Sequence, residues 1–345
     1  MKVSSRRVVI HSTHREKTVS RSRLFWLIAI AVITSGPAAQ AQQGSKLPKL
    51  GFLSGLSASA ISTRLEAFKQ GLNELGYTEG KNTVIEYRWA AGKLDRLPEL
   101  ASELVRLKPD VIVTSGPPSI RAAQRATDTI PIIMAFDSDP VGNGFVASLA
   151  RPGNNITGLS ALFPEISGKR LELLKDIIPR LSRIALFGSS KEPANAQSVK
   201  ETALAAEKLA LKLQYLDVLA LNDIEAAFRA AKKDRADAVL VLGGYIFNYY
   251  PAQLAAHANK NRIAAMYQGS EYAEAGGLIS YGTNIAELFR RAATYVDKVL
   301  KGAEPGNLPV EQPTKFELVI NLKAAKQIGL IIPPNVLARA DKVIR

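Results

Sequence analysis

Serine and glycine residues follow directly after several apolar runs of this sequence. The run VIVT is followed by Ser115, Gly116 and two prolines, and a helical pattern begins near Ser119. A helix N-terminus offers free N–H groups and a partial positive charge, glycine lets the backbone come close, and proline starts a helix without wasting a donor. We expect this loop to hold a ligand carboxylate, with ordinary helix capping as the alternative. Ser54 and Ser57, after the run LGFL, are similar candidates.

Two acidic residues follow the next apolar run of the sequence. Asp137 and Asp139 come directly after IPIIMAF. A carboxylate at such a strand end could pair with the amine of a ligand. The alternative is a turn and a helix cap formed by Asp-Ser-Asp-Pro.

Polar and aromatic residues also occupy the expected strand ends in the second half of the chain. Aromatic rings at these positions could enclose an apolar or ring-bearing ligand, although packing beneath a loop would explain them as well. The candidates are Gly188, Ser189, Gly244, Tyr245, Phe247, Tyr267 and Glu271.

The residue types argue against catalysis and against a bound cofactor. The sequence has no G-x-S-x-G elbow, no phosphate-binding loop and no G-x-G-x-x-G after an expected strand. It has no cysteine, and beyond residue 41 its one histidine is His257, on an expected helix face. A His/Cys metal site is therefore not expected. We expect a binding protein without cofactor or metal.

The N-terminal region has the pattern of a secretory signal peptide. A basic segment precedes the ten-residue apolar run LFWLIAIAVI at 24–33, and Ala39-Gln40-Ala41 supplies a cleavage site. We predict that residues 1–41 are removed and that the mature chain begins at Gln42. An uncleaved anchor and a later start near Val19 are the alternatives, although ten apolar residues are fewer than the ~20 that span a bilayer.

The absence of cysteine and the distribution of charge limit where the protein is expected to be located and which partners it is expected to bind. Without a cysteine to carry a lipid, we expect the mature protein to be free in the periplasm, with no stable insertion in a membrane. Residues 1–41 hold seven Lys or Arg and one acid, so the rest of the chain keeps +8 of the total +14. This charge is spread along the chain without a basic run among aromatic residues, so a nucleic-acid partner is not expected.

Apolar runs and helical patterns alternate through the rest of the chain. Short buried runs such as VIVT alternate with segments whose apolar residues recur at helical spacing, for example 285–300. Buried strands separated by helices predict parallel sheets covered on both faces. Two successive blocks predict an α/β fold with two doubly wound lobes, in which ligands sit beyond the carboxyl ends of the strands.

Several segments together resemble one protein family. They are Gly-Tyr-Thr-Glu-Gly-Lys-Asn (76–82), Glu-Tyr-Arg-Trp-Ala (86–90), Asp-Pro-Val (139–141), Asn-Ile-Thr-Gly-Leu-Ser (155–160), Gly-Gly-Leu-Ile-Ser-Tyr-Gly (276–282), Leu-Pro-Val-Glu-Gln-Pro-Thr-Lys-Phe-Glu-Leu-Val-Ile-Asn (308–321), Ile-Pro-Pro (332–334) and Ala-Arg-Ala-Asp (338–341). In this order they resemble the substrate-binding proteins of ABC importers that include tryptophan- and tyrosine-binding proteins. That family's lipid-anchor cysteine is missing here, which leaves the substrate open.

The resemblance implies a type I periplasmic binding fold whose two lobes are joined by a three-strand hinge. The crossings are expected near Asn155–Gly158, Tyr281–Asn284 and Pro309–Lys315. Lobe one would comprise 46–157 and 283–311, and lobe two 158–282 and 312–345.

The function implied is that of a monomer that binds a small organic solute between the lobes, either an amino acid or an aromatic or organic acid. The protein would deliver this solute to an ABC permease in the inner membrane. The alternatives are a ligand-sensing protein for a membrane receptor and a periplasmic α/β enzyme. A transcriptional repressor with the same core is disfavoured, because the basic N-terminal region holds an apolar decamer and a cleavage site in place of a helix-turn-helix.

Overall fold

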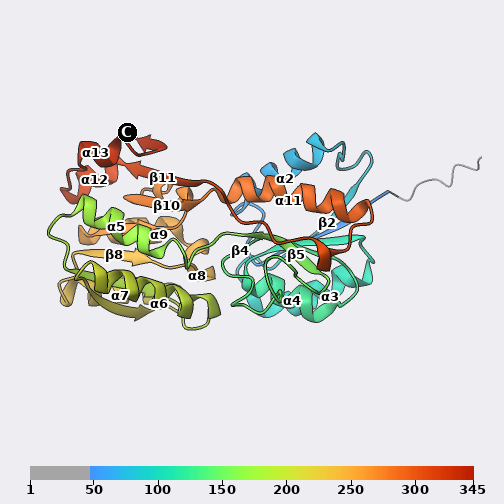
Figure 1. Cartoon of the computed structure of the whole chain (residues 1–345), viewed down its shortest axis with the longest axis horizontal. Helices are drawn as coiled ribbons and strands as arrows, with labels where there is room; N and C mark the ends of the chain where they lie inside the picture. Colours follow the sequence, from blue (N-terminus) through green and yellow to red (C-terminus); the bar gives the residue numbers. More distant parts are fainter. Residues whose placement is uncertain (1–46) are drawn as a thin grey trace, which may run out of the picture. The chain divides into compact units, whose positions relative to one another are not determined.

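The first half of the described chain forms a five-stranded parallel sheet with the strand order β2-β1-β3-β4-β5 (Figure 1). The computed structural model describes residues 47–345, so the expected signal peptide lies outside the described residues. The strands are β1 (Lys49–Ser54), β2 (Val84–Trp89), β3 (Val111–Ser115), β4 (Ile132–Asp137) and β5 (Ile156–Ser160). This sheet and the helices on it are called the first lobe below.

Helices cover both faces of this sheet because the strand residues that point to either face are apolar. On one face lie α2 (Ser62–Glu74) and α11 (Ile285–Leu300), packed on Phe52 of β1. On the other lie α3 (Leu97–Arg106) and α4 (Pro117–Ala126), packed on the neighbouring Leu53. A 3-10 turn, η1 (Leu94–Arg96), precedes α3. Side chains of adjacent strand residues point to opposite faces, which explains the two separate cores.

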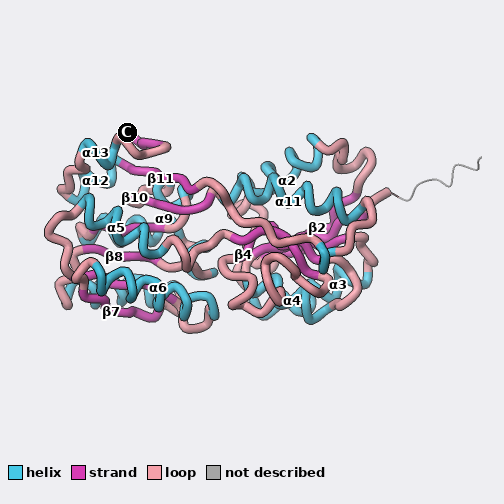
Figure 2. Tube along the Cα trace, in the orientation of Figure 1, coloured by secondary structure: helices cyan, strands magenta, loops and turns pink. Residues whose placement is uncertain are grey.

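The second lobe is built on a seven-stranded sheet with the order β12-β11-β10-β9-β8-β6-β7. Its strands are β6 (Arg183–Gly188), β7 (Lys212–Asp217), β8 (Ala238–Val241), β9 (Ala264–Tyr267), β10 (Ile279–Thr283), β11 (Phe316–Asn321) and β12 (Lys342–Ile344). Its helices are α5 (Ser167–Ile177), α6 (Pro193–Lys208), α7 (Leu221–Lys233), α8 (Tyr245–Tyr249), α9 (Pro251–Asn261), α10 (Ser270–Glu274), α12 (Leu322–Ile328) and α13 (Pro334–Leu337). Figure 2 shows strands and helices alternating in both lobes.

One strand pair differs from the expected parallel arrangement. Strands β10 and β11 are antiparallel, whereas the other strand pairs of residues 47–345 are parallel. The chain leaves β10 at Thr283, forms α11 in the first lobe and returns at Phe316, which pairs with Thr283, so β11 begins at the edge of the sheet where β10 ends. A sheet of mixed direction is therefore a consequence of the excursion through the first lobe.

Three connections join the two lobes. The first follows β5, which extends to Ser160 in the first sheet, so the expected crossing at Asn155–Gly158 falls on β5 and the chain passes over after it. The second is the short step from Thr283 of β10 to Ile285 of α11. The third follows η2 (Pro305–Asn307) and ends at β11. The exact limits of the two lobes remain a prediction.

Among the helices of residues 47–345, none has both the length and the apolar character needed to cross a bilayer.

Candidate ligand-binding site

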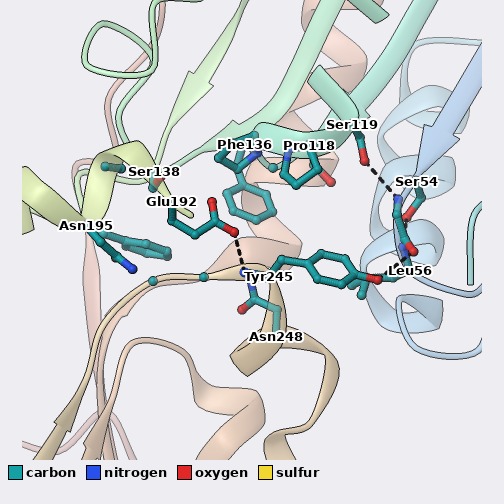
Figure 3. Close-up of a pocket in the computed structure, with 18 of the residues that line it drawn as sticks. Ser54, Leu56, Pro118, Ser119, Phe136, Ser138, Glu192, Asn195, Tyr245 and Asn248 are labelled. Carbon is teal, nitrogen blue, oxygen red and sulfur yellow. Dashed lines mark hydrogen bonds between the residues drawn. The ribbon is translucent and has the colours of Figure 1, made fainter. Parts of the chain in front are cut away.

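A cavity lies where strand ends of the first sheet face strand ends and helix starts of the second lobe (Figure 3). The empty space among its lining atoms is about 670 Å³, part of which is open to solvent. The first lobe contributes Ser54, Gly55, Leu56, Arg64, Ser115, Gly116, Pro117, Pro118, Ser119, Phe136 and Ser138, and the second contributes Glu192, Ala194, Asn195, Ser198, Gly243, Gly244, Tyr245 and Asn248, with Phe163 from the first connection. This is the position at which open α/β sheets bind small ligands.

The loop after β3 lines the cavity, as its sequence suggested it could. Gly116 has a φ of 74°, a backbone conformation that glycine adopts readily. Its N–H donates to the carbonyl oxygen of Phe136 at 3.1 Å, and the prolines at 117 and 118 have no N–H. The Ser119 hydroxyl accepts a hydrogen bond from the backbone N–H of Gly55 at 3.0 Å. The start of α4 therefore presents fewer free donors to an anion than the sequence argument assumed.

The two expected amine-binding acids do not line the cavity. Asp137 is fully buried and accepts hydrogen bonds from the Asn143 side chain at 2.7 Å and from the N–H of Asp139 at 2.9 Å. Burial raises the pKa of Asp137 to about 7. Asp139 accepts from the N–H of Gly142 at 2.9 Å. These contacts match the turn of the alternative interpretation, whereas no helix begins between β4 and β5 for the motif to cap.

The other candidates divide between the cavity and its surroundings. Ser54, Gly244 and Tyr245 line it. Phe247 and Tyr267 are fully buried in the core of the second lobe. Gly188 and Ser189 are buried near Tyr215 and Asn195 respectively. Ser57 is half-buried beside Ser59, and Glu271 forms an ion pair with Arg64 at 2.8 Å.

Sequence reasoning missed several residues that line the cavity. Phe136 is the penultimate residue of β4, where the sequence shows it as one more residue of a buried strand, and Phe163 lies on the connection between lobes. Glu192 precedes the proline that starts α6. A signal existed for Glu192, because it follows the expected strand end Gly-Ser-Ser by two residues. No sequence signal pointed to Arg64 or Asn195.

The cavity lining contains one guanidinium group, Arg64, and one carboxyl group, Glu192, and they differ in their partners. The Arg64 guanidinium is paired with Glu271 and lies 5.9 Å from the ring centre of Phe136. Glu192 accepts a hydrogen bond from the backbone N–H of Tyr245 at 3.0 Å, and no Lys, Arg or His within residues 47–345 forms an ion pair with it. Burial raises the pKa of Glu192.

Two tyrosines of the second lobe reach across to the first. The Tyr245 hydroxyl donates to the carbonyl oxygen of Gly55 at 2.9 Å, and the Tyr249 hydroxyl donates to that of Ala91 at 3.2 Å. Together with the pair between Arg64 and Glu271, these bonds hold the lobes together around the cavity.

A buried arginine supports the cavity wall from behind. The Arg170 side chain is fully buried on α5, donates through Nε to the carbonyl oxygen of Tyr281 at 2.7 Å, and lies 5.5 Å from the ring centre of Phe163. Burial lowers the pKa of Arg170 to about 9. Arg170 thus contacts both the first connection and the strand that leads to the second.

Within residues 47–345 no three His, Cys, Asp or Glu side chains come together in a way that could hold a metal ion. The sequence model of a family described as ABC transporter substrate binding protein matches residues 49–344. The chain belongs to this family. Since the members are substrate-binding proteins, this substrate-binding protein is not an enzyme.

Known relatives agree with this assignment and with the fold. A tyrosine-binding protein of Clostridioides difficile is 26% identical over 265 residues, which cover 77% of this chain and 76% of the relative. A crystal structure of a conserved domain protein from Vibrio cholerae has a TM-score of 0.81 and 31% identity, and the match covers 86% of this chain and 100% of that one. An ABC domain from Streptococcus pneumonia in complex with L-Trp has a TM-score of 0.81 and 27% identity over 87% of this chain and 100% of that one.

These matches confirm the family resemblance and the predicted fold class. Both the α/β type with two doubly wound lobes and the type I periplasmic binding fold are therefore correct for this substrate-binding protein.

Proposed function

We propose that this substrate-binding protein captures an amino acid or a small aromatic or organic acid in the cavity between its lobes and delivers it to an ABC permease. The observation that carries the proposal is a cavity lined from both lobes by aromatic rings, hydroxyl groups and one unpaired carboxylate. The relatives that bind tyrosine and L-Trp support an amino acid as the solute.

The proposed contacts are the lining residues that the sequence had suggested: Ser54, Ser115, Gly116, Ser119, Gly244 and Tyr245. Phe136 and Phe163 would enclose an apolar part of the solute. A solute that touches both lobes stabilises the closed arrangement over the open one, and the three connections act as the hinge. The closed form would then dock on the permease in the inner membrane.

The location proposed is the periplasm, after cleavage of the signal peptide behind Ala41. Mass spectrometry of the protein secreted into the periplasm tests this directly, because the N-terminus should be Gln42. A protein that keeps residues 24–33 and stays with the membrane fraction would contradict the proposal.

Purified residues 42–345 should be screened by thermal shift against amino acids, organic acids, sugars and nucleosides. A solute present at about 100 times its dissociation constant adds about 2.7 kcal/mol to the stability, which raises the melting temperature by several degrees. Isothermal titration calorimetry would then give the affinity and a stoichiometry of one. Absence of any saturable ligand across the panel, with protein refolded from denaturant to remove co-purified solute, would refute the binding role.

A further inference from the structure

The charges around the cavity are not balanced. The lining side chains include one basic group, Arg64, and one carboxyl group, Glu192. Arg64 is already neutralised by Glu271, at 2.8 Å. The remaining unpaired charge that faces the cavity is the carboxylate of Glu192.

Glu192 is held in place without being neutralised. One carboxylate oxygen, Oε1, accepts the hydrogen bond from the backbone N–H of Tyr245 at 3.0 Å, as Figure 3 shows. Within residues 47–345, no donor forms a hydrogen bond with the second oxygen, Oε2. A carboxylate removed from water and left without a cation is unfavourable, and a cationic ligand group placed against it would relieve that cost. Burial already raises the pKa of this group, which is the expected response of a carboxylate without a cation.

The rest of the lining argues against a purely anionic solute. The serine hydroxyls at 115 and 138 can donate hydrogen bonds to a carboxylate, but they bring no positive charge. An acid without an amine would place a second negative charge beside Glu192. A zwitterion avoids this problem, because its ammonium group can face Glu192 while its carboxylate faces the hydroxyl donors.

We propose that Glu192 binds the ammonium group of the solute, so that the site accepts α-amino acids with an apolar or aromatic side chain and rejects the corresponding acids without an amine. This inference rests on the proposed function and narrows its solute class. It also assigns to Glu192 the role that the sequence had suggested for Asp137 and Asp139.

The test compares each amino acid with its amine-free counterpart. The pairs are L-phenylalanine and 3-phenylpropionate, L-tyrosine and 3-(4-hydroxyphenyl)propionate, and L-tryptophan and 3-indolepropionate, measured by calorimetry on residues 42–345. A charge-assisted hydrogen bond at a buried site predicts that removal of the amine weakens binding about ten-fold or more. In Glu192→Gln, which keeps an acceptor for the N–H of Tyr245, this difference should fall to about three-fold or less.

Asp139→Asn is the matched control, because it makes the same change to an acid outside the cavity lining and keeps the acceptor for Gly142. It should leave the preference for the amine unchanged. Equal binding of an amino acid and its amine-free counterpart by the unaltered protein would overturn the inference. So would a Glu192→Gln variant that weakens both members of a pair by the same factor, since that result describes a structural role.

The failure of this inference differs from the failure of the proposed function. Saturable binding of an amine-free acid, a sugar or a nucleoside, without binding of any amino acid, would overturn the role of Glu192 and leave the transport role intact. No binding by any compound of the full panel would overturn both.

Discussion

The hydrogen bond from the Tyr245 hydroxyl to Gly55 should shift the balance between closed and open lobes. Tyr245→Phe keeps the ring that lines the cavity and removes the bond of 2.9 Å. A net hydrogen bond contributes about 0.5–1.5 kcal/mol. The carbonyl oxygen of Gly55 also accepts from the N–H of Gly92 at 2.9 Å, so it is not left without a partner. The loss should therefore be in the lower part of this range, about 0.5–1 kcal/mol.

This free energy corresponds to a two- to five-fold fall in the ratio of closed to open molecules, by the relation of about 1.4 kcal/mol per factor of ten. The chain has no cysteine, so a single exposed cysteine in each lobe can be labelled cleanly. Lys81→Cys and Lys232→Cys are suitable exposed positions. Nitroxide labels at these sites, read by pulsed electron resonance, report the distribution of distances between the lobes. Tyr245→Phe should increase the population at the longer distance.

Tyr249→Phe is the internal control for this measurement. Its bond to Ala91 is longer, at 3.2 Å, and exposed to solvent, so its removal should change the ratio by less than about two-fold. An unchanged distance distribution in Tyr245→Phe, or a change in Tyr249→Phe of the same size, would refute the reasoning that the partly buried bond of Tyr245 favours closure.

Two further predictions concern stability. Gly158→Ala should lower the free energy of unfolding by more than about 3 kcal/mol, because Gly158 has a φ of 138° and a Cβ there would lie 2.1 Å from the carbonyl oxygen of Met134. Gly153→Ala, with a φ of 87° but no neighbour closer than 3.9 Å, should lose only about 1–2 kcal/mol in urea unfolding, and equal losses would contradict the steric argument. Asp137 has a pKa of about 7 in the folded protein against 3.8 for the free side chain, so the folded form holds the extra proton between these values. Stability from this group is complete below about pH 4 and falls by up to about 1.4 kcal/mol per pH unit towards pH 7. Asp137→Asn should remove this slope, and parallel pH profiles of the two proteins would show that Asp137 is not its source.

Much of the fold could be predicted because each buried strand of a doubly wound sheet appears in the sequence as a short apolar run, and each covering helix as apolar residues at helical spacing. The helix expected at 285–300 has those bounds in the structure, since its apolar face is continuous between clear end signals. The direction of β11 could not be read, because alternation of side chains along a strand is the same in either direction. Strand β12 has three residues, too few for a periodic signal.

The location of the site could be predicted from the sequence, but only some of the residues that line it could. Strand ends pointed to Ser115, Gly116 and Tyr245 because the carboxyl edge of a parallel sheet is defined by topology. The choice between Asp137 and Glu192 depends on which side chain faces the other lobe, and that is decided by packing between segments distant in sequence. Asp137 lies inside its own turn, where Asn143 and the N–H of Asp139 both donate to Oδ1 and Oδ2 is left without a partner among residues 47–345.

The passage of the chain through the first lobe between β10 and β11 affects the order in which the two lobes can fold. Helix α11 covers a face of the first sheet with α2, where a Cβ on Gly71 would lie 2.2 Å from the backbone oxygen of Arg290. Strand β11 then pairs with β10, and Leu318 and Ile320 fill the core of the second lobe. The core of the first lobe needs α11 and the core of the second needs β11, and both segments leave the ribosome after residue 284. Neither core can therefore be complete before that point of synthesis. The proposed export through a secretory channel would be compatible with this order, because a chain whose two cores are still incomplete has not yet formed the folded lobes.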